Sequence, residues 1–492
     1  MTTMSSTLIK KIMSASCLSL VVLLNSCSKE NDFKPELLEL ENKRVPAPVV
    51  APLNNRELLG KYIYFDASLS ASAGQFARGG AMTQSCASCH LPQQGYAGFE
   101  SGSADRGQMQ WGAVPFSFKS GIGEGAVEGS FGGRKPPSAA YATFSPKLKL
   151  GTLDVAGQYQ GGLFWDGRAT GAELGNPAAE QARGPFLADK EHNFNTVTGR
   201  RDLLVMIRQG SYYPLYKTVY GAGLDNISLT TDPASQLVTD HYNNVAFAIA
   251  AYEASSDVNQ FSSKYDDVMA RRATFNAEEA EGYRLMRSSA TKNCGNSGCH
   301  AEKGETGPAL FTDFTYDNIG LPWKSEYRRE ESLQKGAVDQ GIYTTLVSPN
   351  VPRDLPVQNP EAHIAAFKTP TLRNVALGEN ARSGGPGRGK RFMHNGIFSS
   401  LEEVMHFYNT RDVVGAGWSP SAKADVKTNA DWRPWGAPEY AQTMHRGPEI
   451  GNLGLTVRQE KAIVAFMRTL SDTRPVTPPP AYRATATQQI TN

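Results

Sequence analysis

Apolar residues recur at helical spacing in four segments of the chain, two in each half. Asn55 to Phe65 (NRELLGKYIYF) and Glu278 to Arg287 (EEAEGYRLMR) each precede a cysteine-containing stretch, and Val245 to Glu253 (VAFAIAAYE) and Glu460 to Leu470 (EKAIVAFMRTL) come late in the two halves. This spacing predicts an amphipathic helix in each segment, packed through its apolar face on a neighbour. The same order in both halves indicates a weak internal repeat.

Between these segments the chain is rich in residues that break regular structure. It contains 47 glycines and 29 prolines among 492 residues, and 40% of its residues are hydrophobic. A chain of this length can bury the cores of two domains. We therefore expect a mainly helical protein whose helices are joined by long irregular loops.

The first residues have the pattern of a secretory signal. Residues 1–26 carry only two charges, Lys10 and Lys11, followed by the apolar run Cys17 to Leu24, as in the n-region and h-region of a signal peptide. The run is too short to span a bilayer in the mature protein. It ends in LNSC, which resembles a bacterial lipobox, so we expect a lipidated Cys27 as the first mature residue. The alternative is a soluble secreted protein that is cut nearby.

Removal of this signal takes away both lysines and lowers the formal net charge from +2 to 0. A neutral chain argues against nucleic-acid binding and against a polybasic membrane patch. Residues 27–53 contain four prolines and are expected to form a tether from the lipid to the first domain. Residues 474–492, also rich in proline, are expected to form a disordered tail.

Two cysteine pairs, far apart in the chain, each end in Cys-His. The first is Cys86-Ala-Ser-Cys89-His90, and the second has four residues between Cys294 and Cys299, followed by His300. C-x-x-C-H is the attachment motif of c-type haem, in which the thiols bind the vinyl groups and the histidine binds the iron. A disulfide or a zinc site is the alternative at each place. The adjacent histidine, present twice, favours two covalently bound haems.

From about Asn55 to Asp472 the chain resembles a family, the bacterial dihaem cytochrome c peroxidases and the related MauG-type enzymes. Each matching segment is weak alone, but their order together with two haem motifs is specific. The segments are Leu59–Lys61, Phe65–Asp66, Trp165–Arg168 (WDGR), Gln181–Pro185 (QARGP), Phe314–Pro322 (FTYDNIGLP), Phe367–Leu377 (FKTPTLRNVAL), Met393–Gly396 (MHNG) and Leu401–Val404 (LEEV).

The resemblance implies a mainly α fold of two cytochrome c-like haem domains with long loops. Residues 54–270 would form the N-terminal peroxidatic haem domain, and residues 271–473 the C-terminal electron-transfer haem domain. In the family the N-terminal haem reacts with hydrogen peroxide and the C-terminal haem relays electrons.

The family places a Gln, a Pro and a Glu on the open side of the first haem, and these match Gln181, Pro185 and Glu191. A polar group there moves a proton between the peroxide oxygens. Glu191 could instead be an ordinary surface carboxylate, and His192 could either assist proton movement or be a polar loop residue. No histidine occurs between His90 and His192, so the distal ligand that closes many of these sites is expected to be missing and the first haem to be five-coordinate.

Two further residues are assigned by the resemblance. Counting eight positions from Leu401 gives Tyr408 as the second ligand of the C-terminal haem, where peroxidases have Met and MauG-type enzymes have Tyr. Met393, Met405 and His406 are its rivals, and Tyr408 could also be a packed core residue. Trp165 matches the residue between the two haems, where an indole shortens the electron-transfer gap or simply fills space.

The chain departs from the family at the calcium site between the domains. Gly378 to Arg391 is a Gly- and Arg-rich insert, and Lys135 stands where the resemblance implies an asparagine ligand. A lysine there would repel calcium. Calcium is therefore in doubt, and the basic insert could take over its structural role.

Three functions remain open. The preferred one is reduction of hydrogen peroxide to water with electrons from a donor such as a small cytochrome c, relayed from the C-terminal to the N-terminal haem. The second is MauG-like oxidation of a protein or aromatic substrate with peroxide, which Tyr408 favours. The third is a non-enzymatic electron carrier, against which Gln181 and Glu191 argue. We expect a lipid-anchored, periplasm-facing protein of the cell envelope, and a homodimer is left open.

Overall fold

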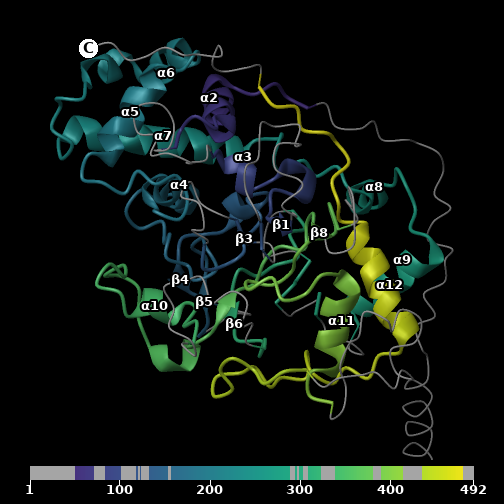
Figure 1. Ribbon diagram of the computed structural model, residues 1–492. Coiled ribbons are helices and arrows are strands. Elements are labelled where there is room, and N and C mark those ends of the chain that lie inside the picture. The colour runs from purple at the N-terminus through teal and green to yellow at the C-terminus, as the bar shows by residue number, and fades with distance from the viewer. Residues whose placement is uncertain are drawn as a thin grey trace, which may run out of the picture. The chain divides into compact units, whose positions relative to one another are not determined.

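The computed structural model describes residues 50–70, 84–100, 118–119, 122–123, 132–152, 157–288, 294–295, 299–302, 308–322, 338–379, 389–413 and 435–479. In these ranges the chain forms helices joined by long irregular loops, as expected (Figure 1). The α-helices are α2 (Asn55–Phe65), α3 (Cys86–Cys89), α4 (Pro177–Leu187), α5 (Gly199–Arg208), α6 (Tyr213–Tyr220), α7 (Gln236–Ala254), α8 (Lys264–Met269), α9 (Ala277–Met286), α10 (Tyr343–Leu346), α11 (Leu401–Thr410) and α12 (Val457–Arg468).

The strands in the described residues are only two residues long and form antiparallel pairs. These pairs are β1 (Phe99–Glu100) with β8 (Gly389–Lys390), β2 (Phe118–Lys119) with β3 (Ile122–Gly123), β4 (Lys149–Leu150) with β5 (Tyr159–Gln160), and β6 (Tyr316–Asp317) with β7 (Phe367–Lys368). Two of the pairs, β1–β8 and β6–β7, join segments that are far apart in the sequence and so fix the loops around the helices.

Helix α2 crosses α7 at a glycine. The helix begins with a capping box, in which the Asn54 side chain accepts from the Glu57 N–H (3.0 Å) and the Glu57 carboxylate accepts from the Asn54 N–H (2.8 Å). A Cβ placed on Gly60 would lie 1.8 Å from the carbonyl oxygen of Ala248 in α7. Only a residue without a side chain allows the two helix backbones to approach this closely.

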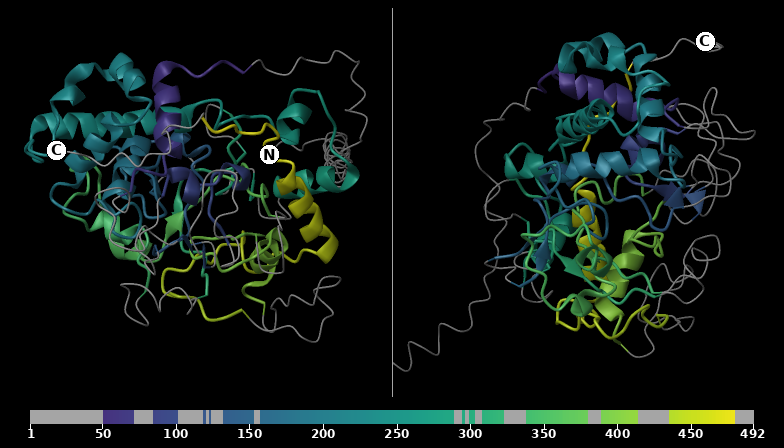
Figure 2. Two further views of the ribbon diagram at one scale, coloured as in Figure 1. Left: turned by 45° about the horizontal axis from the view of Figure 1, so that its top comes forward. Right: turned by 90° about the vertical axis from the view of Figure 1, so that its left-hand side faces the viewer.

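Helices α9 and α12 repeat this arrangement in the second half of the chain. Asn276 and Glu279 form the same capping box at the start of α9 (2.9 and 2.8 Å). A Cβ on Gly282 would lie 1.9 Å from the carbonyl oxygen of Ala462 in α12. The yellow α12 runs beside the teal α9 in the left view of Figure 2, and the two helices are in contact. The internal repeat expected from the sequence is therefore present in these two helix pairs.

Each helix pair lies in its own cluster of buried apolar side chains. The first cluster draws its residues from Leu59 to Val258, together with Leu310. The second draws its residues from Tyr265 to Leu470. The expected domain boundaries, and the assignment of each half to a cytochrome c-like domain, stay predictions.

Asp472, near the end of the described chain, joins residues of both halves. Its carboxylate accepts hydrogen bonds from the hydroxyl of Tyr141 (2.8 Å), which lies 331 residues earlier, from the side-chain amide of Asn374 (2.9 Å) and from the backbone N–H of Ser262 (2.9 Å). Tyr141 belongs to the first apolar cluster. A residue from the end of the chain therefore completes the surroundings of the first core.

Several expectations concern segments outside the described residues. The signal segment 1–26, most of the tether 27–53 and residues 480–492 of the tail are among them, so these expectations stay predictions. Within the described ranges, no helix combines the length and the apolar character that a membrane span requires.

Candidate functional site

The first cysteine motif forms α3, a single helical turn. This turn carries Cys86 and Cys89, and His90 follows as the C-cap. The Nδ1–H of His90 donates to the carbonyl oxygen of Tyr96 (3.2 Å), which leaves Nε2 as the nitrogen with a lone pair. Burial lowers the pKa of His90 to about 4 and raises the pKa of the Cys89 thiol to about 12. The imidazole is therefore neutral, as a metal ligand must be.

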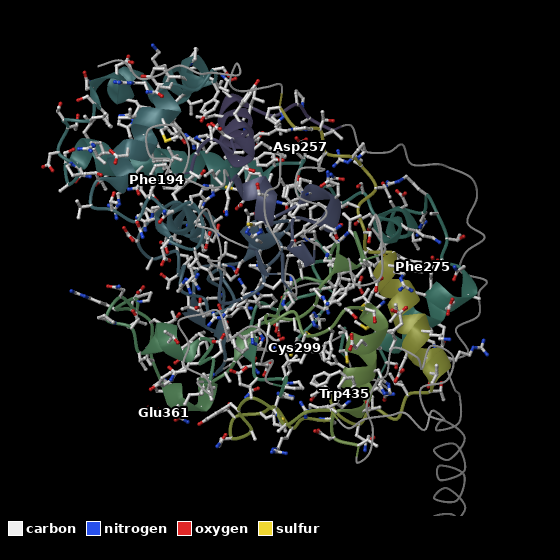
Figure 3. All side chains as sticks on the ribbon, viewed as in Figure 1. Phe194, Asp257, Phe275, Cys299, Glu361 and Trp435 are labelled. Atoms are coloured by element: carbon white, nitrogen blue, oxygen red, sulfur yellow. The ribbon has the colours of Figure 1, made fainter. Side chains whose placement is uncertain are left out.

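The second motif reaches the same arrangement in spite of its wider spacing. The Nδ1–H of His300 donates to the carbonyl oxygen of Phe311 (3.0 Å), and burial lowers the pKa of this imidazole as well. The thiol of Cys299, labelled in Figure 3, donates to a carboxylate oxygen of Asp317 (3.1 Å). Residues 296–298, between the two cysteines, lie outside the described residues.

The first motif lines a cavity of about 570 Å³ whose walls combine apolar and polar groups. Both thiols and the imidazole of His90 are part of its lining. Several polar and charged side chains share these walls, namely Gln181, Glu191, His192, Glu253, Arg134 and Lys135. This cavity can therefore bind a polar substrate and exchange protons with it.

The second motif lines a smaller cavity, of about 190 Å³, whose walls are mostly apolar. Cys294, Cys299 and His300 all take part in it. The apolar part of the lining includes Met286, Leu372, Val375, Phe392, Ile463 and Met467. Such walls suit a flat apolar ring system and exclude water.

Both cavities fit a c-type haem. In each of them two thiols and one lone-pair imidazole nitrogen line the same space, which is the donor set that haem attachment requires. In each of them a backbone carbonyl accepts the other ring N–H and so fixes the orientation of the imidazole. The four cysteines of these motifs are free thiols, so neither pair is joined in a disulfide.

The three residues expected on the open side of the first haem all line the first cavity. Gln181 and Pro185 are in α4. The Pro185 carbonyl accepts hydrogen bonds from the N–H groups of Ala188 (3.3 Å) and His192 (3.2 Å), which folds the chain back after the helix and brings Glu191 to the cavity. Burial raises the pKa of Glu191 to about 7. The carboxyl group therefore exists in both protonation states near neutral pH.

His192 also lines this cavity. Its Nδ1–H donates to the carbonyl oxygen of Leu69 (2.5 Å), and its ring packs on Phe186 with centroids 5.0 Å apart. Burial lowers the pKa of His192 to about 4. The neutral ring keeps Nε2 as a hydrogen-bond acceptor. A part in proton movement stays a prediction.

Trp165 is part of the walls of both cavities. Its indole is buried, and its Nε1–H donates to the carbonyl oxygen of Lys135 (2.7 Å). The ring of His394, which lines the second cavity, lies 6.3 Å from the indole between centroids and stacks on Phe367 at 3.5 Å. Trp165 therefore separates the two cavities, and its position between two haems and its redox role stay predictions.

The four candidate ligands of the second haem differ in whether they line the second cavity. Tyr408, on α11, lines the second cavity, as do Met393 and Met405. The imidazole of His406 is not part of this lining, because its Nδ1 pairs with the carboxylate of Glu460 (3.1 Å). The rival His406 is therefore the weakest of the four. Burial raises the pKa of the Tyr408 phenol, which is protonated in the absence of a metal.

Sequence reasoning missed two buried ionisable groups near the cavities. Glu253, at the end of α7, lines the first cavity, and burial raises its pKa to about 8. It is the one charged residue in the apolar segment VAFAIAAYE, a signal that could have revealed it. Lys368 lines the second cavity, and its ammonium donates to the Ser145 hydroxyl (2.5 Å) and to the carbonyl oxygen of Gly162. In the sequence Lys368 is part of the FKTPTLRNVAL segment, where nothing marks it as a buried cation.

Two buried lysines lie in the segments where the resemblance implied a calcium site. Lys135 is buried and donates to the carbonyl oxygen of Pro136 (3.2 Å). Lys390, at the end of the insert, is also buried and donates to the carbonyl oxygen of Asn374 (2.6 Å). Residues 380–388 of the insert lie outside the described residues. The expectation that calcium is doubtful stays a prediction.

Comparison with known proteins gives consistent matches. A model of the di-haem cytochrome c peroxidase family matches residues 54–274. The chain is 31% identical to the methylamine utilization protein MauG of Paracoccus denitrificans (strain Pd 1222), over 85% of this chain and 88% of that protein. It is 26% identical to the cytochrome-c peroxidase IdrP1 of Denitromonas iodatirespirans, over 88% and 86% of the two chains.

A solved structure supports the same relationship. The crystal structure of the diheme peroxidase BthA from Burkholderia thailandensis E264 matches with a TM-score of 0.61 and 26% sequence identity. The match covers 89% of this chain and 93% of BthA. Two thiol–imidazole cavities and these similarities over most of the chain lead to one conclusion: the chain belongs to the di-haem cytochrome c peroxidase and MauG family, and it is a peroxidase-type oxidoreductase with two haem groups.

Proposed function

We propose that the protein reduces hydrogen peroxide to water at the first haem site, with electrons that a small donor protein delivers through the second site. The observation that carries this proposal is the difference between the two cavities. The first is larger and has Gln181 and Glu191 in its walls, whereas the second is smaller and mostly apolar. Peroxide chemistry needs groups that transfer protons, and electron relay needs none.

Glu191 is the residue that moves the proton. Reduction of hydrogen peroxide to two waters consumes two electrons and two protons, and cleavage of the O–O bond is assisted when a proton passes from the inner to the outer oxygen. The haem, when bound, supplies the iron at which peroxide binds and through which electrons reach it. A carboxyl group with a pKa of about 7 can both accept and return a proton near neutral pH.

Gln181 and His192 complete the polar wall. The amide of Gln181 offers both a donor and an acceptor, so it can orient peroxide beside Glu191. His192 is held neutral by burial, with Nε2 as an acceptor. Gln181 and His192 are both uncharged, so among these three residues Glu191 is the one that can accept and return a proton near neutral pH.

Trp165 and the apolar second cavity form the electron path. Because Trp165 is part of both cavity walls, its indole shortens the gap that an electron must cross between the sites. The apolar lining of the second cavity excludes water from the relay. We assign the order donor protein, second site, Trp165, first site.

A second candidate function, MauG-like oxidation of a protein or aromatic substrate, is favoured by one observation. Tyr408 lines the second cavity together with His300, and a phenolate ligand there would favour oxidised iron over the reduced iron of an electron relay. Turnover with a reduced cytochrome, compared with turnover with aromatic substrates, decides between the two functions.

Three further parts of the proposal concern attachment, location and partners. We assign thioether bonds to the thiols of both cavities, a lipid anchor to Cys27, and a periplasm-facing position in the cell envelope. The LNSC sequence and the free thiols support these assignments. Membrane fractionation of Cys27→Ser tests the anchor, and an unchanged distribution between membrane and soluble fractions would remove it.

Glu191→Gln tests the central step. The change keeps the size of the side chain and removes its ability to accept a proton, so peroxide turnover should fall about 10²–10⁴-fold, the range of a positioned acid–base group. Haem content and the visible spectrum should stay unchanged. Glu278→Gln, at an exposed glutamate of α9, is the matched control. Normal turnover of Glu191→Gln would refute the assignment.

A further inference from the structure

Lys135 holds its ammonium group over the indole of Trp165. The Nζ atom lies 5.9 Å from the centroid of the indole, while the backbone carbonyl of the same lysine accepts the indole N–H at 2.7 Å. The side chain is only 6% exposed, and its ammonium donates to the carbonyl oxygen of Pro136. Burial lowers the pKa of Lys135 to about 8, so the group is mostly charged at neutral pH.

Two carboxylates that line the first cavity together with this indole, those of Asp166 and Asp339, are paired with arginines. Asp166, the next residue in the chain, pairs with Arg134 (2.6 Å) and Arg168 (2.8 Å). Asp339 accepts two hydrogen bonds from Arg134 (2.8 and 2.7 Å). Together with Lys135 these groups comprise three cations and two carboxylates, so this cluster has a net positive charge. Glu191 and Glu253 line the same cavity, and burial raises their pKa values to about 7 and about 8, which reduces their negative charge at neutral pH.

The hydrogen-bond partner of the indole gives an oxidised ring no route for losing its proton. An indole that loses an electron becomes a cation, which is commonly relieved by transfer of the N–H proton to a base. Here the acceptor is the carbonyl oxygen of Lys135, which cannot take up a proton at ordinary pH. The positive charge would therefore have to remain on the Trp165 ring, beside the ammonium group.

We propose that Lys135 is a positioning residue for electron transfer. Its ammonium group disfavours the oxidised, cationic form of Trp165. The indole therefore passes electrons between the haem sites without becoming a long-lived radical. The inference rests on the proposed function, because hydrogen peroxide is the oxidant. In the step that Lys135 opposes, Trp165 loses one electron to the peroxide-oxidised first site and is left as a cation radical. In the step that it permits, the electron comes from the second site and Trp165 ends unchanged.

The interaction is strong enough to decide between these steps. Two unit charges about 6 Å apart, at an effective dielectric constant of about 20, shift an equilibrium by about 100-fold. Removal of the ammonium group should therefore favour oxidation of Trp165 by about that factor. The hydrogen bond to the indole comes from the backbone of Lys135, so a substitution of the side chain leaves it in place.

The experiment compares the radical content of haem-loaded variants. Wild type, Lys135→Gln and Lys135→Arg are mixed with one equivalent of hydrogen peroxide without a donor, frozen, and measured by electron paramagnetic resonance. We expect at least a tenfold larger tryptophan radical signal in Lys135→Gln than in wild type, and a return towards the wild-type level in Lys135→Arg. The double variant Lys135→Gln with Trp165→Phe should lose the signal.

Controls separate charge from structure. The ammonium group of Lys217 lies 5.0 Å from the centroid of the Tyr213 ring, and the Lys217 side chain is half-exposed. Lys217 lines neither cavity, so Lys217→Gln should leave the radical signal as in wild type. Lys135→Met serves as a second neutral variant if Lys135→Gln does not bind haem fully. Peroxide consumption with an unchanged radical signal in the neutral variants would overturn this inference alone. Absence of any reaction with peroxide in wild type would overturn it together with the proposed function.

Discussion

Gly60 of α2 lies against Ala248 of α7 so closely that an added Cβ would be 1.8 Å from the alanine carbonyl oxygen. Gly282 of α9 has the same relationship to Ala462 of α12, at 1.9 Å. Both glycines are in ordinary helical backbone, so the requirement at each crossing is space rather than an unusual φ angle. The two crossings hold the helix that precedes each haem motif on the helix that closes its half.

Gly60→Ala should therefore destabilise the protein. The backbones must separate to admit the methyl group, and overpacking of this kind lowers the free energy of unfolding by about 1–3 kcal/mol. Gly184→Ala in α4 is the matched control, because the nearest atom to its added Cβ would be 3.5 Å away, and alanine there should raise stability by up to about 1 kcal/mol. Denaturant unfolding at equal haem content measures both. Equal stability of the two variants would contradict the tight crossing.

The pH dependence of turnover should reflect Glu191. The carboxylate form accepts the peroxide proton, and the pKa of this group is about 7. Below that pH the group is protonated, so kcat/KM for peroxide should fall about tenfold for each pH unit. Above it the rate should be level. In Glu191→Gln this acid limb should disappear, and an identical limb in the variant would assign the titration to another group.

The fully oxidised protein should react with peroxide at once. The sequence has no histidine between His90 and His192 to close the first site, and the Nδ1–H of His192 is held by the carbonyl oxygen of Leu69. Rapid mixing of the oxidised protein with peroxide should change the haem spectrum without prior half-reduction. If the reaction appears only after half-reduction, and His192→Leu removes that need, His192 is the closing ligand.

Tyr408→Ala should change the second haem alone. Because Tyr408 lines the second cavity and not the first, its loss should alter the spectrum and the reduction potential of the second haem. The first haem should still react with peroxide at a near-normal rate. Met393→Ala and Met405→Ala are the comparison variants. A spectrum that changes in one of these, and stays constant in Tyr408→Ala, would transfer the ligand role to that methionine.

Haem content tests the second cysteine pair. Both Cys294 and Cys299 line the second cavity, so each should form a thioether bond. Wild type should contain two haems per chain by the pyridine haemochrome assay and should retain them in a denaturing gel. Cys294→Ser together with Cys299→Ser should leave one covalent haem. Two covalent haems in this double variant would exclude the second motif as an attachment site.

Local patterns predicted four of the helices, because the causes of those helices are local. Asn55–Phe65 was expected from apolar spacing and is the extent of α2, and the segment expected at 460–470 is α12 at Val457–Arg468. The expected helix at 278–287 is displaced by one residue, since the capping box at Asn276 starts α9 at Ala277. Spacing fixes the apolar face of a helix, while its cap fixes where the helix begins.

The candidate site was predictable where a motif names the residue, and not where the surroundings matter. The cysteine–histidine motifs and the Gln181 to Glu191 offset located residues that line the cavities. The sequence alone could not show that the imidazole of His406 pairs with the carboxylate of Glu460 and does not line the second cavity. Nor could it show that Lys135, interpreted only as a residue that would repel calcium, holds its ammonium over Trp165. Both depend on contacts between distant segments.

The hydrogen bond between Tyr141 and Asp472 constrains the order in which parts of the chain can complete their folding. The two residues are separated by 331 positions, so the hydroxyl of Tyr141 in the first core lacks this partner until residue 472 has been synthesised. Closing a loop of that length is slow compared with the formation of local helices. The packing around Tyr141 in the N-terminal half is therefore completed only after residue 472 has been synthesised and has folded back.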